Sequence, residues 1–147
     1  METSEIILRL PYGKPFVFVD SLEQAGEEGV TGHYIFRKQS VVYQGHFKKK
    51  AVIPGVLLTE CCAQIGLVCL GIFLTAKEEA PETAFALSSA EMEYLIPVMP
   101  GEQVKVRSEK IYFRFGKLKC KVWMWNAEDK LVCKGVLAGM QLKQGYE

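Results

Sequence analysis

This sequence has little excess charge and little histidine. It holds 18 basic and 17 acidic residues, so its formal net charge is +1. A chain so close to neutral has no general electrostatic attraction to nucleic acid or to an anionic membrane, and any charged partner must meet a local patch. There are only two histidines and no Cys-x-x-Cys pair, so we expect no zinc site.

A framework of paired cysteines is also missing, because the chain has five cysteines and an odd number cannot all pair within it. We interpret them as buried thiols of a reducing compartment. The first ten residues place acidic side chains before apolar ones, which is not the order of a secretion signal, so we expect a cytoplasmic protein. The cysteines are Cys61, Cys62, Cys69, Cys120 and Cys133.

Internal repeats and low-complexity segments are absent as well. With 49% hydrophobic and 24% charged residues, the chain has an ordinary globular composition, and its length predicts a single domain over residues 1–147. We expect a short helix at 3–10, capped by Thr3 or Ser4 and stopped before Pro11. Alternation and turn signals predict strands at 16–25, 29–36, 83–98, 103–115, 118–126 and 131–142.

One long apolar run, from Gly55 to about Ala76, is predicted to be the central helix. Its own apolar side chains occur on almost every face of the helix, which indicates that the helix is buried on most sides. At about 30 Å it is also long enough to span a bilayer. Glu60 and Gln64 inside the run, and flanks without an aromatic belt, favour a helix in the core of a soluble protein, so we expect no membrane association.

The strands around this helix predict an α+β fold, in which a curled antiparallel sheet wraps round one long helix. Such a sheet leaves the helix partly uncovered and one edge strand open, and pairing of two copies would close both. In segment 118–126, Trp123 and Trp125 alternate with an apolar face that includes Leu118 and Val122. The tryptophans mark either a subunit contact or a second layer of the same domain.

The candidate catalytic residues lie in the stretch 43–64, which includes the start of the predicted helix. The Pro-Gly pair leaves backbone N–H groups that favour an oxygen carrying negative charge, and Gly55 lets a ligand approach closely. Glu60 is the only charge within the apolar run, so burial should raise its pKa and let it act as an acid. Gln64, at i+4, can hydrogen-bond Glu60, and His46 is suited to be a base.

This stretch resembles the 3-hydroxyacyl-[acyl carrier protein] dehydratases of the hot-dog fold. Their signature is Gly-His-Phe, then Pro-Gly eight and nine residues after the His, an acidic residue fourteen after it, and then Ala-Gln. The same spacing joins Gly45-His46-Phe47, Pro54-Gly55, Glu60 and Ala63-Gln64. The segments 10–20, with Leu-Pro, Pro-Phe and Val-Asp, and 97–104, with Pro-Val and Pro-Gly, are also similar to the family.

The resemblance implies a mechanism and partners. His46 removes a proton from C2 of a 3-hydroxyacyl thioester on acyl carrier protein, and Glu60, supported by Gln64, protonates the departing 3-hydroxyl. The Gly55 N–H holds the thioester carbonyl as charge builds on it. The product is a trans-2-enoyl thioester, and no metal or organic cofactor is needed. The family also implies a homodimer, or a trimer of dimers, in which His46 and Glu60 of one site come from different subunits.

The chain departs from the family pattern between the histidine and the helix. The family has proline directly after Gly-His-Phe and again three residues later, where this chain has Lys48 and Ala51. Tyr12 replaces a family histidine that is not catalytic. A basic run that relatives carry before Pro-Val is absent, so Lys48, Lys49 and Lys50 are the expected docking patch for the acidic carrier protein; the alternative is a solvated loop.

Two other activities stay open at this point. The first is a hot-dog thioesterase that hydrolyses acyl-coenzyme A, and the second is a non-catalytic hot-dog protein that binds an acyl chain or a partner. The spacing of His46 and Glu60 favours the dehydratase, because thioesterases of this fold generally lack it. The altered loop keeps the non-catalytic alternative open.

Overall fold

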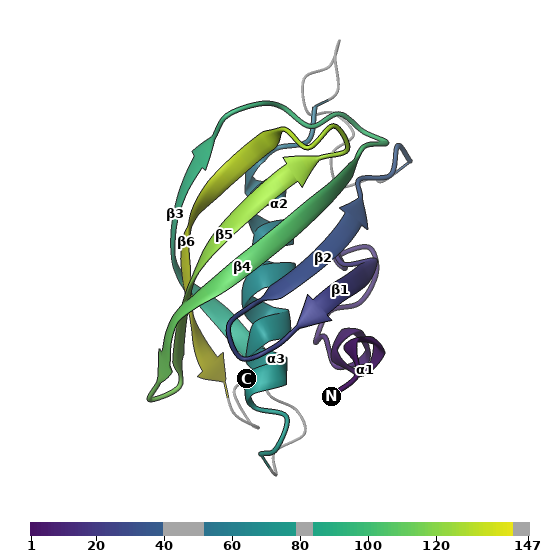
Figure 1. Cartoon of the computed structure of the whole chain (residues 1–147). Coiled ribbons are helices and arrows are strands. Elements are labelled where there is room, and N and C mark those ends of the chain that lie inside the picture. Colours follow the sequence, from purple (N-terminus) through teal and green to yellow (C-terminus); the bar gives the residue numbers. More distant parts are fainter. Residues whose placement is uncertain (40–51, 79–83, 143–147) are drawn as a thin grey trace.

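A computed structural model describes residues 1–39, 52–78 and 84–142. In it, one antiparallel sheet of six strands, in the order β1-β2-β4-β5-β6-β3, curls round a long helix (Figure 1). The strands are β1 (Ser21–Ala25), β2 (Val30–Ile35), β3 (Ala84–Tyr94), β4 (Gln103–Arg114), β5 (Lys117–Asn126) and β6 (Leu131–Leu142). The predicted α+β architecture, a curled sheet wrapped round one long helix as in the hot-dog fold, is confirmed.

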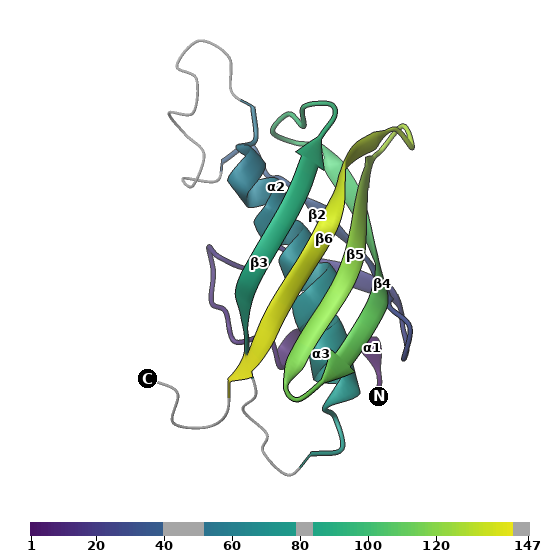
Figure 2. The ribbon, with the colours of Figure 1, turned by 90° about the vertical axis from the view of Figure 1, so that its left-hand side faces the viewer.

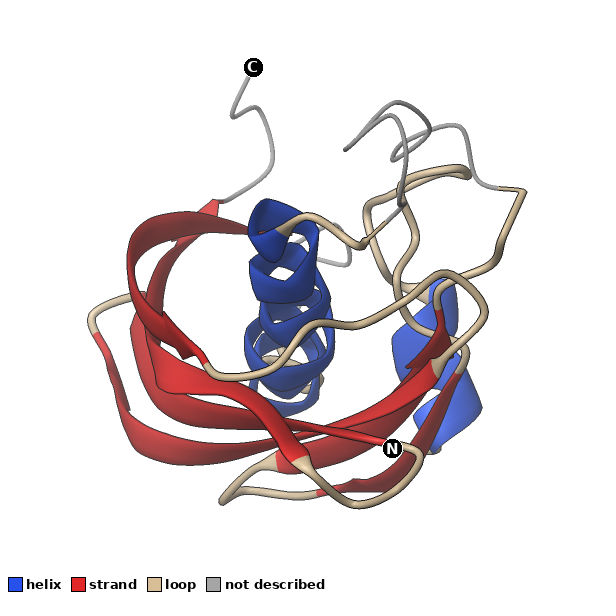
Figure 3. Cartoon of the chain, turned by 90° about the horizontal axis from the view of Figure 1, so that it is seen from above, coloured by secondary structure: helices blue, strands red, loops and turns tan. Residues whose placement is uncertain are grey.

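The central helix runs from Gly55 to Leu74 in three continuous segments. These are α2 (Gly55–Cys62), the π-helical turn η2 (Ala63–Val68) and α3 (Cys69–Leu74). Seen along the helix, the strands curve round part of its circumference and leave another part without a strand (Figure 3). The sequence does not predict η2, because all of its residues are buried and burial on every side gives the same pattern in either kind of helix.

The inner face of β5 supplies some of the side chains that pack against the helix, together with those of β2 and β4. Leu118, Cys120, Val122 and Met124 have no exposed surface, so the predicted inward face is confirmed. Close approach of the helix to this face depends on Gly66. A Cβ atom there would lie 2.8 Å from Cγ1 of Val122, which is too close for ordinary packing.

The first predicted strand is partly wrong. It was expected from residue 16, but β1 begins only at Ser21. In the residues before β1, backbone groups hydrogen-bond to a side chain instead of to a neighbouring strand. The Phe16 carbonyl and the Phe18 N–H both bind the side-chain amide of Gln64 on the helix. The hairpin itself is confirmed, because β1 pairs antiparallel with β2 across a turn in which the Gly26 N–H donates to the Gly29 carbonyl.

The N-terminal helix α1 (Thr3–Leu8) packs against β1 and α3. Glu2 occupies its N-cap position and no side chain caps it, so the predicted cap by Thr3 or Ser4 is wrong, because both already lie inside the helix. Ile6 on α1 is fully buried. Packing of an apolar side chain against the core therefore holds this short helix in place without a cap.

All five cysteines are free and buried, as the sequence predicts. Cys62 on α2 and Cys133 on β6 bring their Sγ atoms to 4.0 Å of each other, which ties the helix to the sheet by packing. The segment Gly55–Leu74, with a mean hydropathy of 2.0, is long and apolar enough to cross a membrane. However, 72% of its most apolar 18-residue window is buried inside the protein, as in the core helix of a soluble fold.

Strand β3 is an open edge of the sheet (Figure 2). Among the described strands it pairs only with β6, and most of its residues are exposed. Apolar side chains at and after its end are exposed too: Tyr94 by 49% and Leu95 by 45%. On the outer face, Trp123 lies 4.9 Å from the Arg107 guanidinium, and the described elements place no second layer over it. A subunit contact at the tryptophans therefore stays a prediction.

Candidate active site

The site begins at the mouth of the central helix, where Gly55 is the first helical residue and Pro54 the N-cap. The Pro54 carbonyl accepts the N–H groups of Leu57, at 2.9 Å, and Leu58, at 3.2 Å. Within the helix, the N–H of Gly55 has no carbonyl to bind, as at every helix start. Together with the helix dipole, this end favours an oxygen that carries negative charge.

Glu60 stands five residues further along the same helix. Its side chain is partly buried, in line with its position in the apolar run. Burial raises the pKa of this carboxyl above its ordinary value, and a hydrogen bond from Gln64 partly offsets the rise. The predicted direction of the shift is confirmed. A carboxyl with a raised pKa holds its proton closer to neutral pH and can act as a general acid.

Gln64 is a fully buried polar side chain with every hydrogen-bonding atom occupied. Its Nε2 donates to Oε2 of Glu60 at 2.9 Å and to the Phe16 carbonyl at 3.0 Å, while its Oε1 accepts the Phe18 N–H at 2.7 Å. The predicted contact between Gln64 and Glu60 is therefore present. The other two bonds fix which way the amide faces, so that its Nε2 donates to the Glu60 carboxyl.

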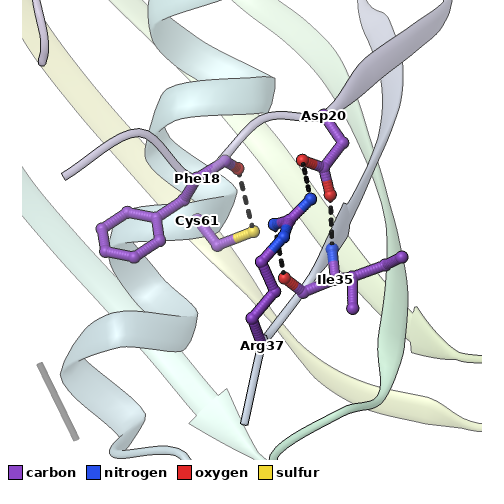
Figure 4. A network of polar contacts seen from close by, with 5 residues as sticks. All are labelled: Phe18, Asp20, Ile35, Arg37 and Cys61. Atoms are coloured by element: carbon purple, nitrogen blue, oxygen red, sulfur yellow. Dashed lines mark hydrogen bonds and ion pairs between the residues drawn. The ribbon is translucent and has the colours of Figure 1, made fainter. Parts of the chain in front are cut away.

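A second polar network, which the sequence does not predict, stiffens the chain beside the helix (Figure 4). The Phe18 carbonyl accepts the thiol of Cys61 at 3.5 Å. Asp20 accepts the Ile35 N–H at 2.7 Å and pairs with Arg37 at 2.8 Å, and Arg37 also donates to the Ile35 carbonyl at 3.0 Å. The sequence shows the Val-Asp pair at the end of segment 10–20 but does not predict that Asp20 binds Arg37. The two residues are 17 apart in the sequence, and no local pattern relates them.

Tyr12 is partly buried and packs against the core. Burial raises the pKa of its hydroxyl to about 12, and the charge of Glu60 adds to the rise. The hydroxyl is therefore protonated throughout the range in which Glu60 titrates. Its ring meets that of Phe16 edge to face, with the ring centres 6.0 Å apart.

The remaining predicted site residues, His46, Lys48, Lys49 and Lys50, lie outside the described residues, and their roles stay predictions. The other histidine, His33, lies on β2 and pairs with Glu23 at 3.1 Å, which accounts for it without a catalytic role. In the described part of the chain, no group of three or more His, Cys, Asp or Glu side chains could hold a metal ion.

The described residues on either side of the His46 segment are both anchored to the connection between β3 and β4. Before the segment, the Phe36 N–H donates to the Glu102 carbonyl at 3.0 Å. After it, the Ile53 N–H donates to the Val98 carbonyl at 2.9 Å. Both flanks are therefore hydrogen-bonded to the same connection, and Ile53 directly precedes the Pro-Gly pair at the helix mouth.

A family model described as a FabA-like domain matches residues 10–138, most of the chain. The chain belongs to the FabA-like domain family. This FabA-like chain is 29% identical over 146 residues to the 3-hydroxyacyl-[acyl-carrier-protein] dehydratase FabZ of Caulobacter vibrioides (strain NA1000 / CB15N). The match spans 99% of this chain and 91% of that protein, so the predicted family is confirmed.

Solved structures share the fold of the FabA-like chain. The dehydratase heterocomplex ApeI:P of Xenorhabdus doucetiae matches with a TM-score of 0.80 and 12% identity, over 95% of this chain and 91% of that chain. A hypothetical thioesterase with coenzyme A from Streptococcus pneumoniae TIGR4 matches with a TM-score of 0.64 and 18% identity, over 84% of this chain and 88% of that chain. At such identities the likeness concerns the fold alone.

Proposed function

We propose that this FabA-like chain dehydrates a 3-hydroxyacyl thioester on acyl carrier protein to the trans-2-enoyl thioester, in fatty-acid or related acyl-chain biosynthesis. The observation that carries the proposal is Glu60, a carboxyl with a raised pKa that stands five residues after the open helix end at Gly55. The spacing of His46 in the sequence and the 29% identity to a FabZ dehydratase support the same reaction.

Each group has one step in the proposed reaction. The Gly55 N–H and the helix dipole stabilise the thioester oxygen while His46 removes the proton from C2. Glu60 gives its proton to the 3-hydroxyl, which leaves as water with the electron pair of the C3–O bond. The electrons of the C2–H bond then form the C2=C3 double bond. Gln64 holds one carboxyl oxygen of Glu60 and leaves the other for the substrate.

The proposed assembly is a homodimer, in which the open edge of β3 pairs with the same strand of a second copy. The exposed backbone edge and the exposed apolar side chains Leu87 and Leu95 support it, because an uncovered strand edge of this kind favours pairing. A twofold pairing would also bring a partner to the uncovered side of the helix (Figure 3). Three such dimers could then associate as a trimer of dimers.

Acyl carrier protein is the proposed macromolecular partner, and the cytoplasm the proposed location. Carrier proteins of this kind are acidic, so a basic patch near the site would receive them. We propose Lys48, Lys49 and Lys50 as that patch, since they follow His46 directly in the sequence. The near-neutral net charge of the whole chain means that such docking depends on a local cluster.

Hydration of a trans-2-enoyl thioester, the reverse reaction, tests this proposal. Loss of the conjugated absorbance of the substrate reports the addition of water. The unmodified protein should catalyse it, and His46→Ala and Glu60→Ala should each abolish it, because each removes one of the two proton-transfer groups. Both variants should keep the far-ultraviolet circular dichroism of the unmodified protein.

The same assay separates the two competing functions. Release of free thiol without hydration would replace the proposal with acyl-coenzyme A thioesterase activity. Absence of any reaction by the unmodified protein, with either carrier-bound or small thioesters, would leave a non-catalytic acyl-binding protein. Full activity in His46→Ala or Glu60→Ala would contradict the assigned roles.

A further inference from the structure

Tyr94 lies over the mouth of the helix, and the proposed mechanism leaves it without a role. A Cβ atom built on Gly55 would lie 3.3 Å from two ring atoms of Tyr94, Cε1 and Cζ. The Tyr94 hydroxyl forms a hydrogen bond with the hydroxyl of Thr59. The ring therefore faces the residue whose N–H is assigned to the thioester carbonyl.

Thr59 is placed to hold this ring at the helix mouth. It stands four residues after Gly55, so the two residues lie on the same face of the helix, one turn apart. Glu60, the next residue, projects about 100° further round the helix. The Tyr94 ring thus borders the helix mouth on one side, and the carboxyl of the proposed acid lies on another.

The backbone of Tyr94 is fixed as firmly as its hydroxyl. Tyr94 is the last residue of β3 and pairs with Cys133 on β6. Directly after it, the Leu95 N–H donates to the Val132 carbonyl at 2.8 Å. A ring anchored at both ends has little rotamer freedom, so a planar group bound beside Gly55 would meet a wall in a defined position.

Tyr94 is not a core residue. Its exposed fraction is 49%, whereas the core residue Phe18 is exposed by only 1%. Much of the Tyr94 surface is therefore available to a bound molecule or to a second subunit. A phenylalanine would fill the same volume, so the hydroxyl pair with Thr59 is the feature that simple packing does not require.

We infer that Tyr94, held by Thr59, positions the substrate by forming the wall against which the planar thioester lies while its carbonyl accepts the Gly55 N–H. The inference rests on the proposed dehydratase function. In this arrangement the ring contributes contact area for binding, and the Thr59 hydroxyl keeps the ring in the orientation that aligns the carbonyl.

A double-mutant cycle on enoyl-thioester hydration tests the inference, with Tyr94→Phe, Thr59→Val and the two combined. Each single change removes one partner of the hydroxyl pair and keeps the volume. We expect each to lower kcat about threefold to tenfold with little change in KM, because alignment is lost while contact area is kept. The double variant should be no slower than the slower single one, since both changes break the same bond.

Two further variants give the comparison its control. Tyr94→Ala removes the wall itself, so KM should rise in addition to the fall in kcat. Tyr112→Phe makes the same chemical change as Tyr94→Phe on β4, where the Tyr112 ring stacks on Arg114. It should leave kcat and KM unchanged. Unchanged kcat in Tyr94→Phe, or additive losses in the double variant, would overturn the inference.

A binding measurement separates this inference from the proposed reaction. A saturated acyl thioester labelled with ¹³C at the carbonyl cannot be hydrated, and its chemical shift reports the hydrogen bond from Gly55. We expect a downfield shift with the unmodified protein and a smaller one with Tyr94→Phe or Thr59→Val. If the protein lacks hydration activity but this pattern appears, the function fails and the positioning role stands. Equal shifts in all proteins would overturn the positioning role.

Discussion

Glu60 is placed where its charged form is unfavourable. Partial burial raises the pKa of its carboxyl, and the hydrogen bond from Gln64 offsets only part of the rise. A carboxyl whose pKa is higher in the folded than in the unfolded state binds its proton more tightly when folded. The protonated carboxyl therefore contributes to the stability of the folded state at pH values below its pKa in the unfolded chain. This contribution is lost as the pH rises through its pKa in the folded protein.

Glu60→Gln tests both consequences at once. Activity should fall by about a hundredfold or more, because the proton donor is gone. Thermal stability at pH 8 should equal or exceed that of the unmodified protein, since no ionised carboxyl is left in the half-buried site. Near pH 4, where the native carboxyl is largely protonated, the difference in Tm should shrink. If the variant were less stable than the unmodified protein at pH 8 but not at pH 4, the ionised carboxyl of Glu60 would stabilise the fold, which contradicts the raised pKa.

At the scale of single residues, the sequence predicts contacts within one helix but not contacts between different elements. The hydrogen bond between Gln64 and Glu60 follows from their i,i+4 spacing alone. The bonds from Gln64 to Phe16 and Phe18 join residues 48 and 46 apart, and no local pattern encodes them. The pairing of Tyr94 with Thr59 was missed for the same reason.

At the scale of elements, the close packing of the helix against the sheet depends on a glycine, Gly66, which has no side chain. Gly66 in η2 lies against Val122 and Ser108, where a Cβ atom would come within 2.8 Å and 3.0 Å of their side chains. Alanine normally favours a helix over glycine by about 1 kcal/mol. Here the clash with a rigid, fully buried valine should outweigh that gain.

We therefore expect Gly66→Ala to lower the free energy of unfolding by about 1–3 kcal/mol. Urea denaturation, followed by circular dichroism, measures the loss. Adding Val122→Ala to Gly66→Ala should cost less than the sum of the two single changes, because the smaller side chain makes room for the new methyl group. Stabilisation by Gly66→Ala alone would mean that the helix and β5 are not in close contact at this point.

The elements themselves were largely predictable, and their ends were not. Alternation in β5 identified the inward face, because that strand packs one side against the core. The π-helical turn η2 and the late start of β1 at Ser21 were missed. Both depend on how the helix meets distant segments, so the local sequence carries no periodic signal for them.

At the scale of the whole molecule, the uncovered helix and the open strand β3 predict association. Light scattering coupled to gel filtration should give twice the chain mass of 16.5 kDa for a dimer, or six times that mass for a trimer of dimers. A single chain mass at micromolar concentration would contradict the proposed assembly. It would also leave His46 and Glu60 of different chains unable to share a site.

Reversal of the three charges at Lys48, Lys49 and Lys50 to glutamate tests the docking surface. We expect KM to rise about tenfold or more for a substrate on acyl carrier protein and to stay unchanged for a small thioester, because only the carrier meets the basic patch. The same reversal at Lys117, Lys119 and Lys121 on β5 is the matched control and should change neither. Equal changes for both substrates would argue for a solvated loop.

The most direct test of the central claim is the forward reaction on the carrier itself. A 3-hydroxyacyl thioester of acyl carrier protein is incubated with the unmodified protein, and the intact carrier is weighed by mass spectrometry. The predicted result is a loss of one water molecule from the carrier, which is absent with Glu60→Ala and His46→Ala. Loss of the whole acyl group, or an unchanged mass at high protein concentration, would contradict the assignment as a dehydratase.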